Sequence, residues 1–449
     1  MKRDNEDMEV PKIPPGTDSS VSGKINIMKG GYRWRICALL FFATTLNYMD
    51  RHVLSLLAPN LQIQFGWSEI DYGYIVTAFQ AAYGIGVVLV GKLLDHKGVK
   101  VLYALAVSIW SLAGMAHAFA GSVLSFSISR FALGLGESAN FPAALKTVSE
   151  WFPAKERALV AGIFNAGSNV GIIAAAFMVP WIAIQFSWEW AFLGVGALGF
   201  VWVGFWLMIY QKPKNHPKLS SDELKHIQSQ KKNDPVQKIP WNKVLLKRET
   251  VIICLVRFIS DPTWWFLLFW LPKFLNEKHG ITLVDIGLPM IIIYVIADVG
   301  SVAGGWLSSY FVKKNRGLDY ARKRTMLICA LCVLPIVFAS QTESFWMAVA
   351  LISLAAAAHT GWMANVYAII SDVFPDNTIG TVTGISVLSA VSGGMVFATT
   401  IGFILEKTGS YFLIFLISSF AYLVAWILLK LGIPRLKLIN FNKHKKVDL

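Results

Sequence analysis

Seven ionisable side chains lie within segments that are otherwise strongly apolar, and their types point to proton transfer and anion capture. A carboxyl group can take up and release a proton, whereas a guanidinium binds a carboxylate through paired hydrogen bonds. Inside a membrane-crossing segment each such group costs at least ~2.5 kcal/mol, so it should line a polar passage or pair with another charge. The seven residues are Asp50, Arg51, Arg130, Glu137, Arg257, Asp261 and Asp298.

Two of the apolar segments carry most of this chemistry. In the first apolar segment, residues 34–57, Asp50 and Arg51 are adjacent. Their side chains point about 100° apart on a helix, so one faces a cavity and the other a neighbouring helix. Asn47 shares the face of Arg51. In the fourth apolar segment, residues 122–145, Arg130 and Glu137 lie on the same helix face, two turns or ~10 Å apart. Burial favours a protonated glutamate and a nearby arginine favours an ionised one, which suits a proton switch. The alternative is a static Glu–Arg pair that joins the two helices.

The second half of the chain offers fewer polar groups. Arg257 and Asp261 stand at i and i+4, so they either neutralise each other or leave Arg257 to capture a carboxylate. His359 interrupts a stretch of small apolar residues. It stands 222 residues after Glu137, and the same offset separates the two copies of an internal repeat described below. Trp362 lies on nearly the same face, and an aromatic ring beside a polar donor fits a sugar ring. The alternative for both is packing.

Twelve apolar blocks surround these groups, and each is long enough to cross a bilayer as a helix. The chain has 449 residues, of which 55% are hydrophobic and only 15% charged; a soluble domain has about 25% charged residues. Helices are expected because lipid offers backbone groups no hydrogen-bond partner. We therefore predict an all-α membrane protein with spans at 34–57, 72–91, 101–120, 122–145, 158–182, 190–210, 251–271, 286–310, 325–340, 345–370, 380–403 and 411–432.

The net charge of +14 indicates how the chain is oriented in the membrane rather than binding to nucleic acid. With residues 1–33 in the cytoplasm, 35 of the 41 Lys and Arg residues fall in the two tails and in the loops after spans 2, 4, 6 and 8, counting Arg35 and Lys430 at the ends of the first and last spans. This bias predicts a multi-pass protein of a cell (inner) membrane with both termini cytoplasmic. Residues 1–33 are polar, so no cleavable signal peptide is expected. The four cysteines lie in apolar spans, and we expect neither a metal nor a cofactor.

An internal repeat divides the chain into two bundles of six helices. Glu150-Trp151-Phe152-Pro153 recurs 222 residues later as Asp372-Val373-Phe374-Pro375, at the equivalent place before spans 5 and 11. Internal repeats with a site at their interface are typical of transporters. The predicted parts are a cytoplasmic tail 1–33, a bundle 34–210, a cytoplasmic linker 211–250, a second bundle 251–432 and a cytoplasmic tail 433–449.

The loop after span 2 reads Gly91-Lys-Leu-Leu-Asp95-His-Lys-Gly98-Val-Lys100. It resembles the G-x-x-x-D-x-x-G-x-[KR] signature of the major facilitator superfamily. The resemblance implies the major facilitator fold of two pseudo-symmetric bundles, with Gly91, Asp95 and Gly98 bracing a cytoplasmic gate. We place Arg130 with these residues as an ion-pair or gating residue.

A closer resemblance is to the anion:cation symporters, and within them to the hexuronate transporters. It is carried by segments from span 4 to span 10, including Ser149 to Arg157, Phe164-Asn165, Trp270-Leu271-Pro272, Ala358-His359 and Ser371 to Phe374. It implies that Asp50 and Glu137 are the protonatable acids, that Arg51 binds the substrate carboxylate, and that Tyr48, Tyr83 and Trp362 line the site. Aldonate transporters keep an acid at the position of Asp50 and not all hexuronate transporters do, whereas His359 favours a hexuronate.

These observations predict proton-coupled import of a small anionic sugar acid, such as glucuronate or galacturonate, by a monomer in the lipid bilayer. Arg51, Tyr48, Asn47, Tyr83, Arg257, His359 and Trp362 are the candidate substrate-binding residues, and Asp50 and Glu137 the proton-coupling ones. No catalytic arrangement is apparent, so no enzyme is expected. The alternatives are an aldonate, aldarate or other carboxylate symporter, an organophosphate antiporter, and a substrate sensor that does not transport.

Overall fold

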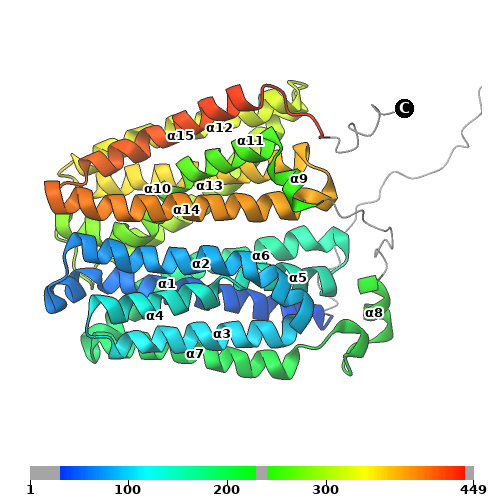
Figure 1. Ribbon diagram of the computed structural model, residues 1–449, viewed down its shortest axis with the longest axis horizontal. Coiled ribbons are helices and arrows are strands. Elements are labelled where there is room, and N and C mark those ends of the chain that lie inside the picture. The colour runs from blue at the N-terminus through cyan, green and yellow to red at the C-terminus, as the bar shows by residue number, and fades with distance from the viewer. Residues whose placement is uncertain (1–30, 229–239, 440–449) are drawn as a thin grey trace, which may run out of the picture.

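The computed structural model describes residues 31–228 and 240–439, and in these ranges every regular element is a helix (Figure 1). The two bundles lie side by side, with the first below the second in Figure 1. The first bundle consists of α1 (Arg33–Phe65), α2 (Glu69–Lys97), α3 (Val99–Ala116), α4 (Val123–Glu137), α5 (Asn140–Trp151), α6 (Ala154–Gln185) and α7 (Trp188–Ile209). The second consists of α10 (Arg248–His279), α11 (Gly287–Lys313), α12 (Leu318–Val333), α13 (Phe345–Val373), α14 (Asp376–Thr408) and α15 (Phe412–Gly432).

Shorter elements complete the chain. Two short helices, α8 (Ser221–Gln228) and α9 (Trp241–Leu245), lie between the bundles in sequence, on the side that also carries residues 31 and 439. We call this the terminus-bearing side and the other the sealed side. The remaining elements are the 3₁₀ helices η1 (His117–Phe119), η2 (Pro213–Asn215) and η3 (Leu334–Ser340).

The prediction of twelve membrane-crossing segments in two bundles is confirmed. Ten helical segments in the described ranges are long and apolar enough to cross a membrane. The other two are α1, whose polar centre lowers its hydropathy, and the segment 123–151, which is split into α4 and α5 around Ser138 and Ala139. The predicted span 122–145 is therefore two helices, and several others, notably α1 and α10, run well past the predicted ends.

The repeated sequence motif marks the same break in both bundles. Phe152 ends α5 and Pro153 precedes α6, and Phe374 and Pro375 do the same between α13 and α14. Both phenylalanines donate a backbone hydrogen bond to the residue four positions back. Proline fixes φ and is well suited to start a helix, so each motif ends one helix and begins the next.

The two bundles are joined from the middle of the membrane to the sealed side. Among the described residues the linking hydrogen bonds include Tyr72 Oη to the carbonyl of Phe269 (2.7 Å) and Thr77 to Thr399 (3.1 Å). Lys273 also forms an ion pair with Glu69. A Cβ at Gly73 or Gly402 would press on the facing bundle's backbone. The bundles are therefore tightly closed on this side.

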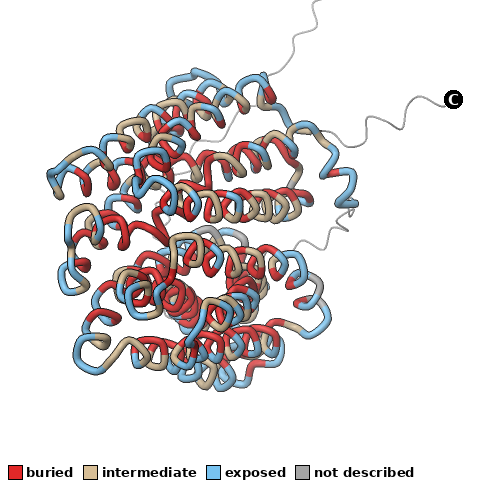
Figure 2. The backbone as a smooth tube through the Cα atoms, turned by 60° about the vertical axis from the view of Figure 1, so that its left-hand side comes forward, coloured by how far each residue is buried: buried red, intermediate tan, exposed pale blue. Residues whose placement is uncertain are grey.

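The helices part towards the terminus-bearing side. The α-carbons of Gly91, Gly162, Gly380 and Gly384 face open space, since a Cβ added to any of them would meet no described atom within 4 Å. These glycines belong to α2, α6 and α14, the helices that meet across the two bundles at the sealed side. Figure 2 shows that buried residues concentrate inside each bundle. The conformation is thus closed on one side and parted on the other.

Candidate functional site

The centre of the candidate site is a buried ion pair between α1 and α4. Arg51 donates two hydrogen bonds to Glu137 Oε2, from Nη2 at 2.7 Å and from Nε at 3.0 Å. It donates a third, weaker one to Asn47 Oδ1 at 3.4 Å. The side chains of Arg51 and Glu137 are only 3% and 0% exposed. Glu137 Oε1 and Asn47 Nδ2 have no hydrogen-bond partner within the described ranges, so the site retains polar capacity beyond the pair.

Aromatic rings surround the guanidinium of Arg51. Its Cζ lies 4.6 Å from the ring centre of Tyr48, 5.1 Å from Phe79, 5.3 Å from Tyr83 and 5.8 Å from Trp265. A cation near an aromatic face is stabilised by the ring quadrupole. The first three rings belong to the first bundle and Trp265 belongs to α10 of the second. Arg51 therefore lies at the junction of the two bundles, in contact with rings from both.

Asp50 and Arg130 occupy a separate place inside the first bundle. Asp50 faces α3, where a Cβ on Gly114 would lie 3.2 Å from its Oδ1. Its Oδ2 has no described hydrogen-bond partner. Arg130 donates from both Nη atoms to the backbone carbonyl of Arg51, at 3.3 Å each. Arg51 points at the junction and Asp50 into the bundle, as adjacent helical positions require. Arg130 holds the backbone from which both project.

Arg257 is paired within its own helix. It donates to Asp261 Oδ2 from Nη2 at 2.7 Å and from Nε at 3.0 Å, and to Ser386 Oγ of α14 at 3.1 Å. Its Cζ lies 5.6 Å from the ring centre of Tyr367. The sequence left two interpretations open for Arg257, and in this conformation it pairs with Asp261.

His359 and Trp362 belong to a second aromatic cluster, centred on Tyr422 of α15. His359 Nδ1 shares a 2.6 Å hydrogen bond with Tyr422 Oη, and its ring stacks on Trp264 at 4.8 Å. Trp362 is fully buried and meets Tyr422 edge-on at 5.4 Å. Neither residue is brought into contact with Arg51. Trp264, which neighbours Trp265 in sequence, is the closest link between this cluster and the junction.

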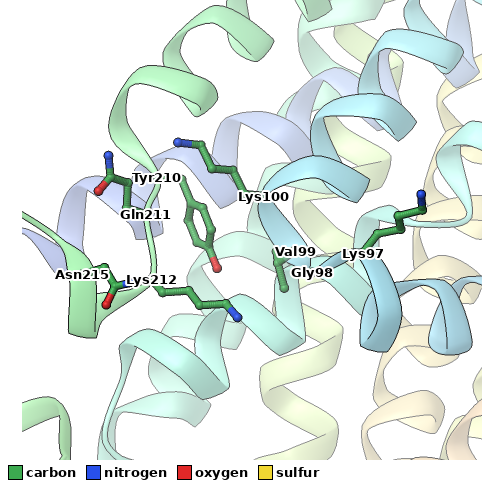
Figure 3. Close-up of a pocket in the computed structure, with 8 residues that line it drawn as sticks. All are labelled: Lys97, Gly98, Val99, Lys100, Tyr210, Gln211, Lys212 and Asn215. Carbon is green, nitrogen blue, oxygen red and sulfur yellow. The ribbon is translucent and has the colours of Figure 1, made fainter.

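The signature loop lies far from the ion pair. Gly98 has φ +75° and connects α2 to α3, a conformation that favours glycine. The side chain of Asp95 lies outside what the structure describes. Nearby, a hollow of about 300 Å³ is lined by Lys97, Lys100 and Lys212 among others (Figure 3). Lys97 is fourteen helical residues, or about 21 Å, beyond Tyr83, so this hollow is distinct from the Arg51 site.

Several site residues were not found from the sequence. Phe79 and Trp265 contact Arg51, and Tyr422 anchors His359. Gln80 is fully buried between α2 and α14, and neither of its amide atoms has a described partner. Of these, only Gln80 gave a signal, as an uncharged polar residue in an apolar span; Phe and Trp are too frequent in this chain to stand out.

Comparison with known proteins decides the family. The sequence profile of the Major Facilitator Superfamily matches residues 40–318. The hexuronate transporter of Escherichia coli (strain K12) is 31% identical over 384 residues, which cover 84% of this chain and 89% of that protein. The chain belongs to the Major Facilitator Superfamily.

Other relatives of the superfamily agree. The galacturonate transporter of Dickeya chrysanthemi is 35% identical over 309 residues, 68% of this chain and 90% of that protein. Among solved structures, a bacterial homologue of the human lysosomal transporter Spinster, in an inward-facing and occupied conformation, aligns with a TM-score of 0.69 at 18% identity. The alignment covers 89% of this chain and 95% of that one. The protein is therefore a multi-pass membrane protein of a transporter superfamily and not an enzyme.

Proposed function

We propose that this protein imports a hexuronate, such as glucuronate or galacturonate, together with protons by alternating access. The observation that carries the proposal is the Arg51–Glu137 pair: a carboxylate-binding group held by an acid, at the junction of two bundles. The hexuronate and galacturonate transporters among its relatives support the choice of substrate.

Competition for Arg51 provides the coupling. In the described conformation one oxygen of Glu137 accepts both hydrogen bonds from the guanidinium. A proton on Glu137 removes the negative charge that holds Arg51, and the substrate carboxylate takes its place. A guanidinium donates paired hydrogen bonds equally well to either carboxylate. The loaded site is then near neutral, whereas a site with Glu137 ionised and substrate bound carries an excess negative charge. Moving that charge through a low-dielectric closed state is costly, so only the protonated, loaded form crosses readily.

The conformation fits one end of such a cycle. If both termini are cytoplasmic, as the positive-inside bias indicates, the parted side faces the cytoplasm and the sealed side faces outward. The described conformation is then inward-facing. Import requires the opposite state as well, in which the contacts of Glu69, Tyr72 and Thr77 with the second bundle separate.

Proton number determines the driving force. One proton per monoanion moves no net charge, so a pH gradient contributes about 1.4 kcal/mol per unit, or roughly tenfold accumulation. Two protons, for example on Glu137 and Asp50, would add the membrane potential at about 2.3 kcal/mol per 100 mV. Asp50 faces α3 and not Arg51, so a proton there would act through Arg130 and the α1 backbone.

Uptake into proteoliposomes tests the proposal. Labelled glucuronate should accumulate when the outside is acidic, and clamping the voltage at zero should reveal whether the potential contributes. Unlabelled galacturonate, galactonate and a phosphate ester serve as competitors that distinguish hexuronate, aldonate and organophosphate transport. Uptake that ignores both pH and voltage would refute proton symport, and stronger competition by galactonate than by galacturonate would move the assignment to an aldonate.

A further inference from the structure

Asp298 is an acid in the middle of α11 that the proposed mechanism does not use. Its Oδ1 accepts a hydrogen bond from the Asn169 amide of α6, so the contact crosses from one bundle to the other. The side chain of Asp298 is exposed although it lies midway along a membrane-crossing helix. A carboxylate at that depth is expected to line a wet passage rather than face lipid.

The surroundings of Asp298 differ from those of Glu137 and Asp261, two other acids within membrane-crossing helices. Glu137 and Asp261 each accept two hydrogen bonds from an arginine. Within residues 31–228 and 240–439, no ion pair to Asp298 is found, and its Oδ2 accepts no hydrogen bond from protein. One carboxylate oxygen is thus available to a neutral donor.

A second polar group lies one turn away on the same helix. Tyr294 is 1% exposed, and its hydroxyl has no hydrogen-bond partner among the described residues. At i and i+4 the side chains of Tyr294 and Asp298 are neighbours on one helix face. A buried hydroxyl without a partner loses the hydrogen bonds that it makes in water, so a ligand that supplies one is favoured.

This pair of residues is close to the Arg51 site. The ring of Tyr294 lies 5.9 Å from Trp264, whose sequence neighbour Trp265 covers Arg51. It also lies 6.1 Å from His52, the residue after Arg51 on α1. Asp298 is about one helical turn, or ~6 Å, farther along α11. Tyr294 is therefore in ring contact with the sequence neighbours of both Arg51 and Trp265, and Asp298 follows it on the same helix.

We propose that Asp298, Asn169 and Tyr294 form the hydroxyl-binding half of the substrate site. This inference rests on the proposed function and specifies its substrate class: polyhydroxylated acids rather than plain carboxylates. The carboxylate of Asp298 accepts hydrogen bonds from neighbouring sugar hydroxyls, while Arg51 binds the acid group at the other end of the molecule. Hydrogen bonds to an ionised acceptor are stronger than neutral ones. Because Asn169 and Asp298 belong to different bundles, the hydroxyls of the substrate bridge both.

Paired ligands test the assignment on the purified full-length protein. Glucuronate and cyclohexanecarboxylate both carry a carboxylate on a six-membered ring, but only the first has hydroxyls. Asp298→Asn should weaken glucuronate binding about tenfold or more, the effect of losing a charge-assisted hydrogen bond. It should leave cyclohexanecarboxylate unchanged or slightly tighter, because a negative charge is removed. Isothermal titration gives both dissociation constants, and Asp285→Asn, an acid in the loop before α11, is the matched control.

The outcomes separate the inference from its alternatives. An equal loss for both ligands would overturn it and show that Asp298 only joins α6 to α11. No change for either ligand would also overturn it. A double-mutant cycle with a deoxy analogue of glucuronate sharpens the result, since removing the contacted hydroxyl should matter in the wild type and not in Asp298→Asn. If the wild type binds no sugar acid at all, the proposed function fails, which is a different result.

Discussion

Each bundle contains an arginine–carboxylate pair that is almost fully buried, and the two pairs have similar geometry but are built differently. Arg51 and Glu137 are 86 residues apart and join two helices, whereas Arg257 and Asp261 are four apart on one helix. In the proposed mechanism, one proton on Glu137 opens the first pair. The second pair lies within α10 alone. Pseudo-symmetric bundles can therefore share a fold while their buried charges are paired differently, between two helices in the first and within one helix in the second.

The largest effect is expected from Arg51→Ala. Truncating one partner of a buried, hydrogen-bonded charge pair in a binding site costs about 2–5 kcal/mol of binding free energy, so sugar-acid binding should fall by roughly thirtyfold or more. Binding titrations on the purified protein measure this. Arg257→Ala is the counterpart, and a larger loss of binding there than in Arg51→Ala would reverse the comparison between the bundles.

Glu137→Gln should separate binding from coupling. The amide keeps the size of the side chain but cannot be ionised, so substrate exchange continues while pH-driven accumulation is lost. The wild type should gain roughly tenfold accumulation per pH unit for one proton, and the variant none. Counterflow and gradient-driven uptake in the same proteoliposomes provide the two measurements. Normal accumulation by the variant would exclude Glu137 from the proton role.

A smaller effect is expected when the Arg257–Asp261 pair is removed as a unit. The double variant Arg257→Met with Asp261→Leu replaces a buried ion pair by apolar groups, which is often neutral for stability. Transport should stay within about threefold of wild type, whereas Arg257→Met alone should lower thermal stability because it leaves Asp261 unpaired. Loss of transport in the double variant, with the fold intact, would assign substrate binding to Arg257.

The smallest effect concerns the third hydrogen bond of each arginine, which goes to an uncharged residue. Asn47→Ala removes a weak hydrogen bond to Arg51 and should reduce substrate affinity about fivefold or less, the equivalent of ~1 kcal/mol. Ser386→Ala removes the corresponding bond to Arg257 and should leave affinity unchanged. Competition binding measures both. Equal effects in the two variants would indicate that the arginines contribute alike.

The sequence specified the helices better than the side-chain partners. Hydropathy located twelve spans, and the repeated Phe-Pro motif located the same helix break in both bundles, because both signals are local. The pairing of Arg51 with Glu137 was one of two interpretations, since a shared helix face does not determine which neighbour it meets. Trp265 and Tyr422 were not found, because their roles depend on how α10 and α15 are rotated in the bundle.

The end of one helix was also predicted wrongly. The predicted span 251–271 ends before Lys273 and leaves this residue outside the helix. In the structure α10 continues to His279, and Lys273 is fully buried. A lysine reduces hydropathy, so a window of apolar residues stops at it even though its ion pair with Glu69 compensates the charge. Sequence patterns do not reveal a partner 204 residues away.

The buried amine of Lys273 has a consequence for the whole transport cycle. It lies against Glu69 of the first bundle and Glu277 of its own helix, 3.4 Å away. When that side opens, one ammonium and two carboxylates enter solution together, where dissolved ions screen them. Raising the ionic strength on the sealed side should therefore favour the opened form and shift the resting equilibrium towards it. Distance measurements between labels on the sealed-side ends of α2 and α14, at low and high salt, would show this as a change in populations.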